Sequence, residues 1–158
     1  IPYGNSSVVP FEKRFYAGGA NSVRGWGVRT LGPGSFATRN SQNSFIYQCG
    51  VIRFDASIEF RSKLFWVIEG AAFVDAGNIW TIRDYADQPG GVFKFGKFYE
   101  QLALAYGVGL RMNFTYFLVR LDMGMKAHDP ASGQEHWPMF SPNFKRDSEF
   151  HFSVGYPF

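Results

Sequence analysis

Five strand-length segments of this chain alternate apolar and polar residues, and every charge in them falls on the same alternate face. The segments span residues 52–60, 64–76, 102–114, 119–125 and 150–158. Their charged residues are Arg53, Asp55, Glu59, Glu69, Asp75, Arg111, Arg120 and Asp122. A two-residue period indicates β-strands, because successive side chains of a strand point to opposite faces. The charge-free face carries mainly Leu, Phe, Val, Ile and Met.

A charge-free face suits contact with lipid, because Lys or Arg on the lipid side of a barrel costs about 2–4 kcal/mol at the bilayer midplane. The connections favour the same environment. We predict tight turns at Ser62-Lys63 and at residues 113–116, and long connections at residues 81–98 and 127–148. Short turns at one end and long loops at the other are typical of outer-membrane barrels. We therefore expect an all-β fold, an antiparallel transmembrane β-barrel.

A soluble antiparallel sandwich is the alternative, since its strands also alternate between an apolar core and water. A sandwich gives no reason for short and long connections to separate to opposite ends. Five strands do not close a barrel, because the smallest outer-membrane barrels have about eight. The sequence has no initiating Met and no signal peptide, so we expect a mature fragment or the tail of a longer chain with upstream strands.

Composition narrows the classes of protein that remain. The chain has 158 residues, 46% of them hydrophobic, and its longest uninterrupted apolar stretch, residues 102–110, falls well short of a membrane-spanning helix. The 16 basic and 13 acidic residues are mixed, which does not favour nucleic-acid binding. The single Cys49 excludes an internal disulfide and a cysteine-based metal site. Aromatic residues near segment ends are candidates for interfacial girdles: Trp66, Trp80, Tyr99, Tyr116, Phe117 and Tyr156.

The amino-terminal part is glycine-rich and contains the motif Val23, Arg24, Gly25 and Trp26. Taken alone, it reads as a flexible extracellular loop. The four residues, however, resemble the VRGF/Y motif in the lumen loop of the BamA/TamA outer-membrane assembly and translocation superfamily, the bacterial surface antigen family. Trp26 stands where Phe or Tyr is usual. The run at residues 10–19 looks closer to TamA-like members.

A second match follows downstream. Phe73, Asp75 and Gly77 look like the F-x-D-x-G strand motif of the same family, and Glu59 lies where the preceding strand carries an acidic residue. The resemblance implies that residues 1–44 are the end of a preceding strand and a long loop folding into the barrel lumen. It implies that residues 45–158 are the carboxy-terminal transmembrane strands.

Glu59 and Asp75 both belong to the inward rows, so a loop that enters the lumen could place the Arg24 guanidinium against them. The planar fork of arginine suits carboxylates. The alternative is that Glu59 and Asp75 pair across neighbouring strands with Arg53, Arg61 or Arg120. The two arrangements can coexist.

The last segment carries aromatic residues at alternate positions, with Phe152, Tyr156 and Phe158 resembling the terminal β-signal of outer-membrane proteins. Ser153 stands where Gly is common, and Pro157 lies one residue before the end. Proline is confined to the edges or ends of sheets because it lacks a backbone donor. The resemblance implies a lateral seam at this strand that opens for client strands. An ordinary sealed seam is the alternative.

The resemblance implies a bacterial outer-membrane protein that inserts, assembles or translocates other proteins. Its expected partners are outer-membrane lipid, unfolded client proteins, periplasmic or envelope subunits and the upstream strands. A passive porin or structural barrel is the alternative. We expect no enzyme, no catalytic residues, no cofactor and no metal site, since His128, His136 and His151 are scattered. A membrane-embedded hydrolase would have to use His151 with Ser153.

Overall fold

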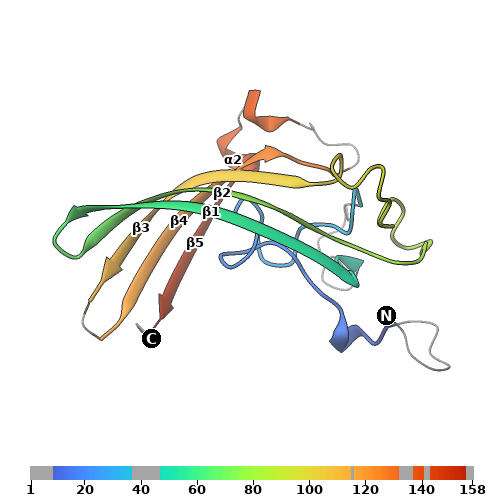
Figure 1. Ribbon diagram of the computed structural model, residues 1–158, viewed down its shortest axis with the longest axis horizontal. Helices are drawn as coiled ribbons and strands as arrows, with labels where there is room; N and C mark the ends of the chain where they lie inside the picture. Colours follow the sequence, from blue (N-terminus) through green and yellow to red (C-terminus); the bar gives the residue numbers. More distant parts are fainter. Residues whose placement is uncertain (1–8, 37–46, 115, 132–136, 141–142, 156–158) are drawn as a thin grey trace.

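The structure is a computed structural model that describes residues 9–36, 47–114, 116–131, 137–140 and 143–155. Its five strands form one antiparallel sheet in chain order (Figure 1). They are β1 (Ile52–Phe65), β2 (Ile68–Trp80), β3 (Ala103–Asn113), β4 (Leu118–His128) and β5 (Ser148–Gly155). Short helical turns among the described residues are η1 (Phe11–Lys13), η2 (Pro138–Phe140) and α2 (Phe144–Asp147). The predicted all-β antiparallel fold is confirmed, and the described strands form an open sheet.

No helix among the described residues is long and apolar enough to cross a membrane.

The register confirms the predicted separation of the two faces. Ser57 lies opposite Asp75, Glu69 opposite Arg111, and Asp122 opposite His151, so these side chains share the inward face. The outward row is exposed, with Ile58 at 79%, Phe60 at 73% and Val108 at 55%. A soluble sandwich would bury this row beneath a second sheet, so the exposed row contradicts the sandwich alternative.

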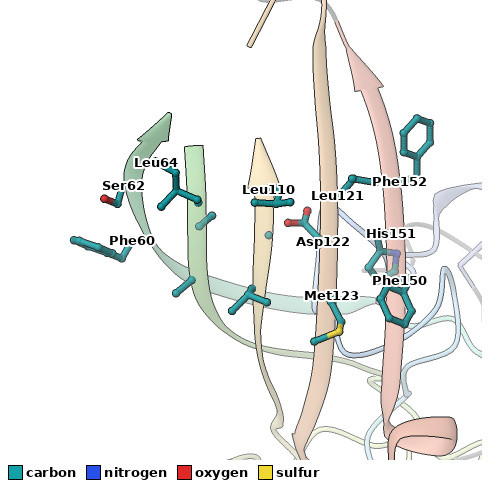
Figure 2. Close-up of a pocket in the computed structure, with 15 residues that line it drawn as sticks. Phe60, Ser62, Leu64, Leu110, Leu121, Asp122, Met123, Phe150, His151 and Phe152 are labelled. Atoms are coloured by element: carbon teal, nitrogen blue, oxygen red, sulfur yellow. The ribbon is translucent and has the colours of Figure 1, made fainter. Parts of the chain in front are cut away.

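Figure 2 shows outward side chains around an apolar hollow of about 670 Å³. Phe60 and Leu64 of β1 border one side, and Phe150 and Phe152 of β5 border the other. Leu110, Leu121 and Met123 stand between them. This surface suits acyl chains, because its lining is almost entirely apolar.

The predicted turn at Ser62-Lys63 is wrong. β1 continues to Phe65 and the chain reverses at Trp66 and Val67, with Trp66 at a positive φ of 36°. Lys63 lies opposite Glu69, so an opposite-charge pair across the strands extends the ladder past two residues that often form turns. The second predicted turn is confirmed, since β3 ends at Asn113 and β4 begins at Leu118.

The long connections lie at the opposite end of the sheet from these turns (Figure 1). They run over residues 81–102 and 129–147. β4 extends to His128, which was expected in the loop. The pairing of β3 with β4 continues past a register irregularity between Ala105 and Leu104, so that Leu104 lies opposite His128. His136 lies outside the described residues.

The amino-terminal segment lies under the arch of the sheet, drawn in blue in Figure 1. Isolated bridges join Phe15 to Gly50 and Ala17 to Leu31. The hydrophobic core lies between this segment and the inward face of the sheet, and its residues are Ala17, Val23, Trp26, Leu31, Ile79, Ala103 and Ala105. We call residues 14–34 the inner loop. Its predicted boundary with the strands, between residues 44 and 45, lies outside the described residues.

Candidate functional site on the inward face

Arg24 is the centre of the site. Its Nε donates to Asp75 Oδ2 at 2.8 Å, and its Nη2 donates to Asp75 Oδ1 at 2.8 Å. The backbone nitrogen of Arg24 also donates to Asp75 Oδ2, at 3.1 Å. Both residues are buried, with Arg24 3% and Asp75 1% exposed. This two-point pairing fixes the direction of the guanidinium as well as its position.

The other donors of Arg24 reach β1. Nη1 donates to Glu59 Oε2 at 2.6 Å and Nη2 to Ser57 Oγ at 3.1 Å, while Ser57 Oγ donates to Asp75 Oδ1 at 2.7 Å. The Phe73 ring lies 3.4 Å from the guanidinium carbon, covering one face of the cation. Burial lowers the pKa of Arg24, but hydrogen bonds with Asp75 and Glu59 outweigh burial and raise the pKa above its ordinary value. Arg24 therefore remains charged inside the site.

A second arginine, Arg111 of β3, lies beside the first. Its Nη2 donates to Glu59 Oε2 at 3.0 Å, and its Nη1 donates to Asp122 Oδ1. The alternation predicts Arg111 and Asp122 as inward residues but does not predict them as part of the site. Their common inward phase was the available signal. The sequence alone does not provide the strand register that brings the two residues together.

The structure places Glu59 among several arginines. Besides Arg24 and Arg111, Arg61 Nε donates to Glu59 Oε1 at 2.6 Å. Arg120 reaches Asp122 Oδ2 at 3.3 Å, and Arg53 pairs with Asp55. Pairing with the loop and pairing within the strands therefore coexist at Glu59, whereas Asp75 is bonded to Arg24.

The inner loop approaches the strands so closely that only glycine fits beneath it. A Cβ on Gly124 would lie 2.1 Å from the carbonyl oxygen of Arg24. A Cβ on Gly77, in the predicted strand motif, would lie 2.9 Å from Val23 Cγ2. Both distances are too short for a real side-chain contact, so these glycines allow the backbone of the loop to pack against the strands.

The remaining motif residues anchor the loop on both sides of Arg24. Val23 is 1% exposed and Trp26 4% exposed, and both belong to the core cluster. A Cβ on Gly25 would lie 2.8 Å from Ala105 Cβ, so this position also lies tight against β3. Lys126 Nζ lies 5.1 Å from the centre of the Trp26 ring. The four consecutive residues thus act as one packed unit around the arginine.

The last strand contacts the loop through a residue that we had not placed in the site. His151 Nε2 lies 3.0 Å from the carbonyl oxygen of Arg24. A carbonyl only accepts hydrogen bonds, so Nε2 is the donor. His151 is therefore bonded to the backbone of the inner loop. A hydrolytic pair would instead require a bond between His151 and Ser153.

The other predicted residues of the last strand are only partly described. Phe152 lies on the outward face and is 68% exposed. Tyr156, Pro157 and Phe158 lie outside the described residues. Among the described residues, no group of three or more His, Cys, Asp or Glu could hold a metal ion.

Comparison with known proteins assigns the family. The model of the Omp85 superfamily domain matches residues 1–158. The chain belongs to the Omp85 superfamily. This Omp85 chain is also 31% identical, over 90 residues, to the outer membrane protein assembly factor BamA of Neisseria meningitidis serogroup B (strain ATCC BAA-335 / MC58). The match covers 54% of the chain but 11% of that relative. Membership of the superfamily places the chain in the bacterial outer membrane.

Proposed function

We propose that this chain supplies the carboxy-terminal strands and lumen loop of an outer-membrane barrel that inserts, assembles or translocates other proteins, without turning over a substrate. Membership of the Omp85 superfamily and similarity to a protein named as an assembly factor support this proposal. The proposed partners are outer-membrane lipid, unfolded outer-membrane or secreted clients, periplasmic or envelope subunits, and further strands of the same barrel.

The observation that carries the proposal is the anchoring of the inner loop by Arg24. A buried ion pair contributes little net stability compared with a well-packed apolar contact, but it holds one specific arrangement. Arg24 contacts β1 and β2 through Glu59 and Asp75, and the carbonyl of the same residue contacts β5 through His151. One loop residue therefore connects the last strand with two strands across the sheet.

We place client contact at a lateral seam along β5. Among the described strands, β5 lies at one edge of the sheet and pairs with β4 alone, as β1 at the opposite edge pairs with β2 alone. Open edges are not tolerated in lipid, so this edge requires another strand, either of the same barrel or of a client. Pairing of a client strand with β5 would be β-augmentation. The proposed insertion signal includes Phe152 together with Tyr156 and Phe158.

Replacement of Arg24 by Ala tests the function. We expect Arg24→Ala in the full-length protein to lower the level of client proteins in the outer membrane, because the loop loses its anchor. Arg29→Ala is the matched control, since Arg29 is an exposed arginine of the same loop that stacks on Tyr16 at 4.3 Å. Quantitative immunoblots of outer-membrane fractions measure client levels, normalised to the level of the variant barrel. Wild-type client levels with Arg24→Ala would refute the proposed role of the loop.

A further inference from the structure

The connection between β2 and β3 packs against the end of β2. Trp80 lies opposite Ile52 in the outward row, at the end of β2 from which this connection leaves. The Phe93 ring meets the Trp80 ring edge-on, with the ring centres 5.4 Å apart. The backbone nitrogen of Phe93 donates to the carbonyl of Thr81 at 3.0 Å. These contacts place Phe93 beside the end of β2, and Tyr99 at the end of the segment lines a hollow together with Leu104 of the outward row.

This segment alternates aromatic rings with lysines. Phe93, Phe95 and Phe98 form a ring cluster, with centres 5.2 Å and 6.1 Å from Phe93. Phe95 is 84% exposed, and Lys94 and Lys97 are exposed beside it. Aromatic rings next to lysines suit a bilayer interface, because the rings enter the apolar layer while the ammonium groups reach lipid phosphates.

The connection between β4 and β5 adds a second part to the same surface. His128 lies opposite Leu104, so it belongs to the outward face, and the Trp137 ring lies 4.6 Å from the His128 ring. Trp137 is 47% exposed and Phe140, in the turn that follows, is 79% exposed. We call residues 93–99 and 137–140 together the outer collar.

A hollow of about 580 Å³ lies between the two parts of the outer collar. It is lined by Tyr99, Glu100, Leu102, Leu104, His128 and Trp137. Most of this lining is apolar, which suits a hydrocarbon chain, whereas Glu100 disfavours an anion at its own edge. Lys97 is bonded to the backbone of Glu100 through a tight turn, with Glu100 N donating to Lys97 O at 3.2 Å. This turn places Lys97 close to Glu100 at the border of the hollow, so the exposed lysines of this segment are the cations available to the anionic part of a ligand.

We propose that the outer collar binds a membrane phospholipid of net negative charge, with an acyl chain in the hollow and the phosphate against Lys94 and Lys97. The charge of the lysines is complementary to phosphate. The exposed rings of Phe95, Tyr99 and Phe140 match the interfacial layer at which such a phosphate lies. The site lies on the outward face, away from Arg24, so it is independent of the proposed role of the inner loop.

Native mass spectrometry of the full-length protein in a nonionic detergent tests the site. We expect dioleoyl phosphatidic acid to bind at least tenfold more tightly than dioleoyl phosphatidylcholine. Each lysine near a lipid phosphate contributes roughly a fivefold change in affinity, so Lys94→Gln/Lys97→Gln should weaken phosphatidic acid binding roughly 25-fold. Phe95→Ser/Tyr99→Ser should weaken the binding of both lipids.

The matched control is Lys13→Gln/Arg29→Gln, which removes the same charge from two exposed residues outside the outer collar. It should leave phosphatidic acid binding unchanged. Equal affinity for the two lipids, or unchanged phosphatidic acid binding in Lys94→Gln/Lys97→Gln, would overturn the proposal. Inorganic phosphate that displaced the lipid at the same concentration would also overturn it, because the acyl chain would then contribute nothing.

Discussion

The pair formed by Arg24 and Asp75 allows the anchor of the inner loop to be measured as a coupling free energy. In Arg24→Met, Asp75 stays buried with Ser57 as its remaining side-chain donor, and Glu59 loses its 2.6 Å partner. Removing one member of a buried pair typically costs about 3–5 kcal/mol, mostly by leaving the other charge uncompensated. We expect Arg24→Met to reduce the free energy of loop docking by an amount in this range.

Asp75→Asn should cost less, about 2–3 kcal/mol, because Arg24 keeps its bond to Glu59. The double variant Arg24→Met/Asp75→Asn leaves no buried charge from this pair, while Glu59 retains Arg61 and Arg111. The two single effects should therefore not add. We expect a coupling free energy of about 2 kcal/mol.

Amide hydrogen exchange on the full-length barrel measures this free energy locally. The reporters are the loop hydrogen bonds from Gly19 N to Trp26 O and from Trp26 N to Val23 O. A loss of 3 kcal/mol should speed exchange in residues 18–31 about 150-fold, since each 1.4 kcal/mol is a factor of ten. Peptides from β2 and β3 serve as the internal control. If the effects of Arg24→Met and Asp75→Asn add strictly, Arg24 does not anchor the loop through Asp75. If exchange in β2 and β3 accelerates as much as in the loop, the effect of Arg24 is not specific to the loop.

Two further predictions use the same exchange measurement. Gly124→Ala should weaken docking of the loop by about 1–3 kcal/mol, because the new Cβ would clash with the Arg24 carbonyl. Gly155→Ala is the control, because a Cβ there meets nothing within 4 Å and should leave loop exchange unchanged. Phe73→Leu should weaken docking by about 1–2 kcal/mol through loss of the ring against the guanidinium, while Phe54→Leu, on the exposed outward face, should not; equal effects would exclude the ring contact.

Alternation predicted the faces of the strands because a two-residue period is a local property of the sequence. The position of the first turn, in contrast, depends on how β1 pairs with β2. Ser62 and Lys63 suit a turn by composition, but the ladder continues through them, with Ser62 opposite Gly70 and Lys63 opposite Glu69. Turn chemistry alone could not anticipate a partner six residues away whose register was unknown.

The same limit explains which site residues were missed. Arg111 and Asp122 have the right inward phase, but their contact depends on the register of β3 against β4. His151 donates to a backbone carbonyl, and such an acceptor leaves no side-chain signature in the sequence. Gly124 carried a usable signal, since glycine within a strand often marks a close backbone approach.

The charges of the inward face couple docking of the inner loop to the register of the strands. The carboxylates around Arg24 come from three strands, Glu59 from β1, Asp75 from β2 and Asp122 from β4. Among the ion pairs of the described residues, Asp75 is paired with Arg24 alone, so undocking of the loop removes its cationic partner. Equally, Arg24 meets its full set of partners only after the strands are in register. The docked position of the loop is therefore compatible only with strands that hold this register.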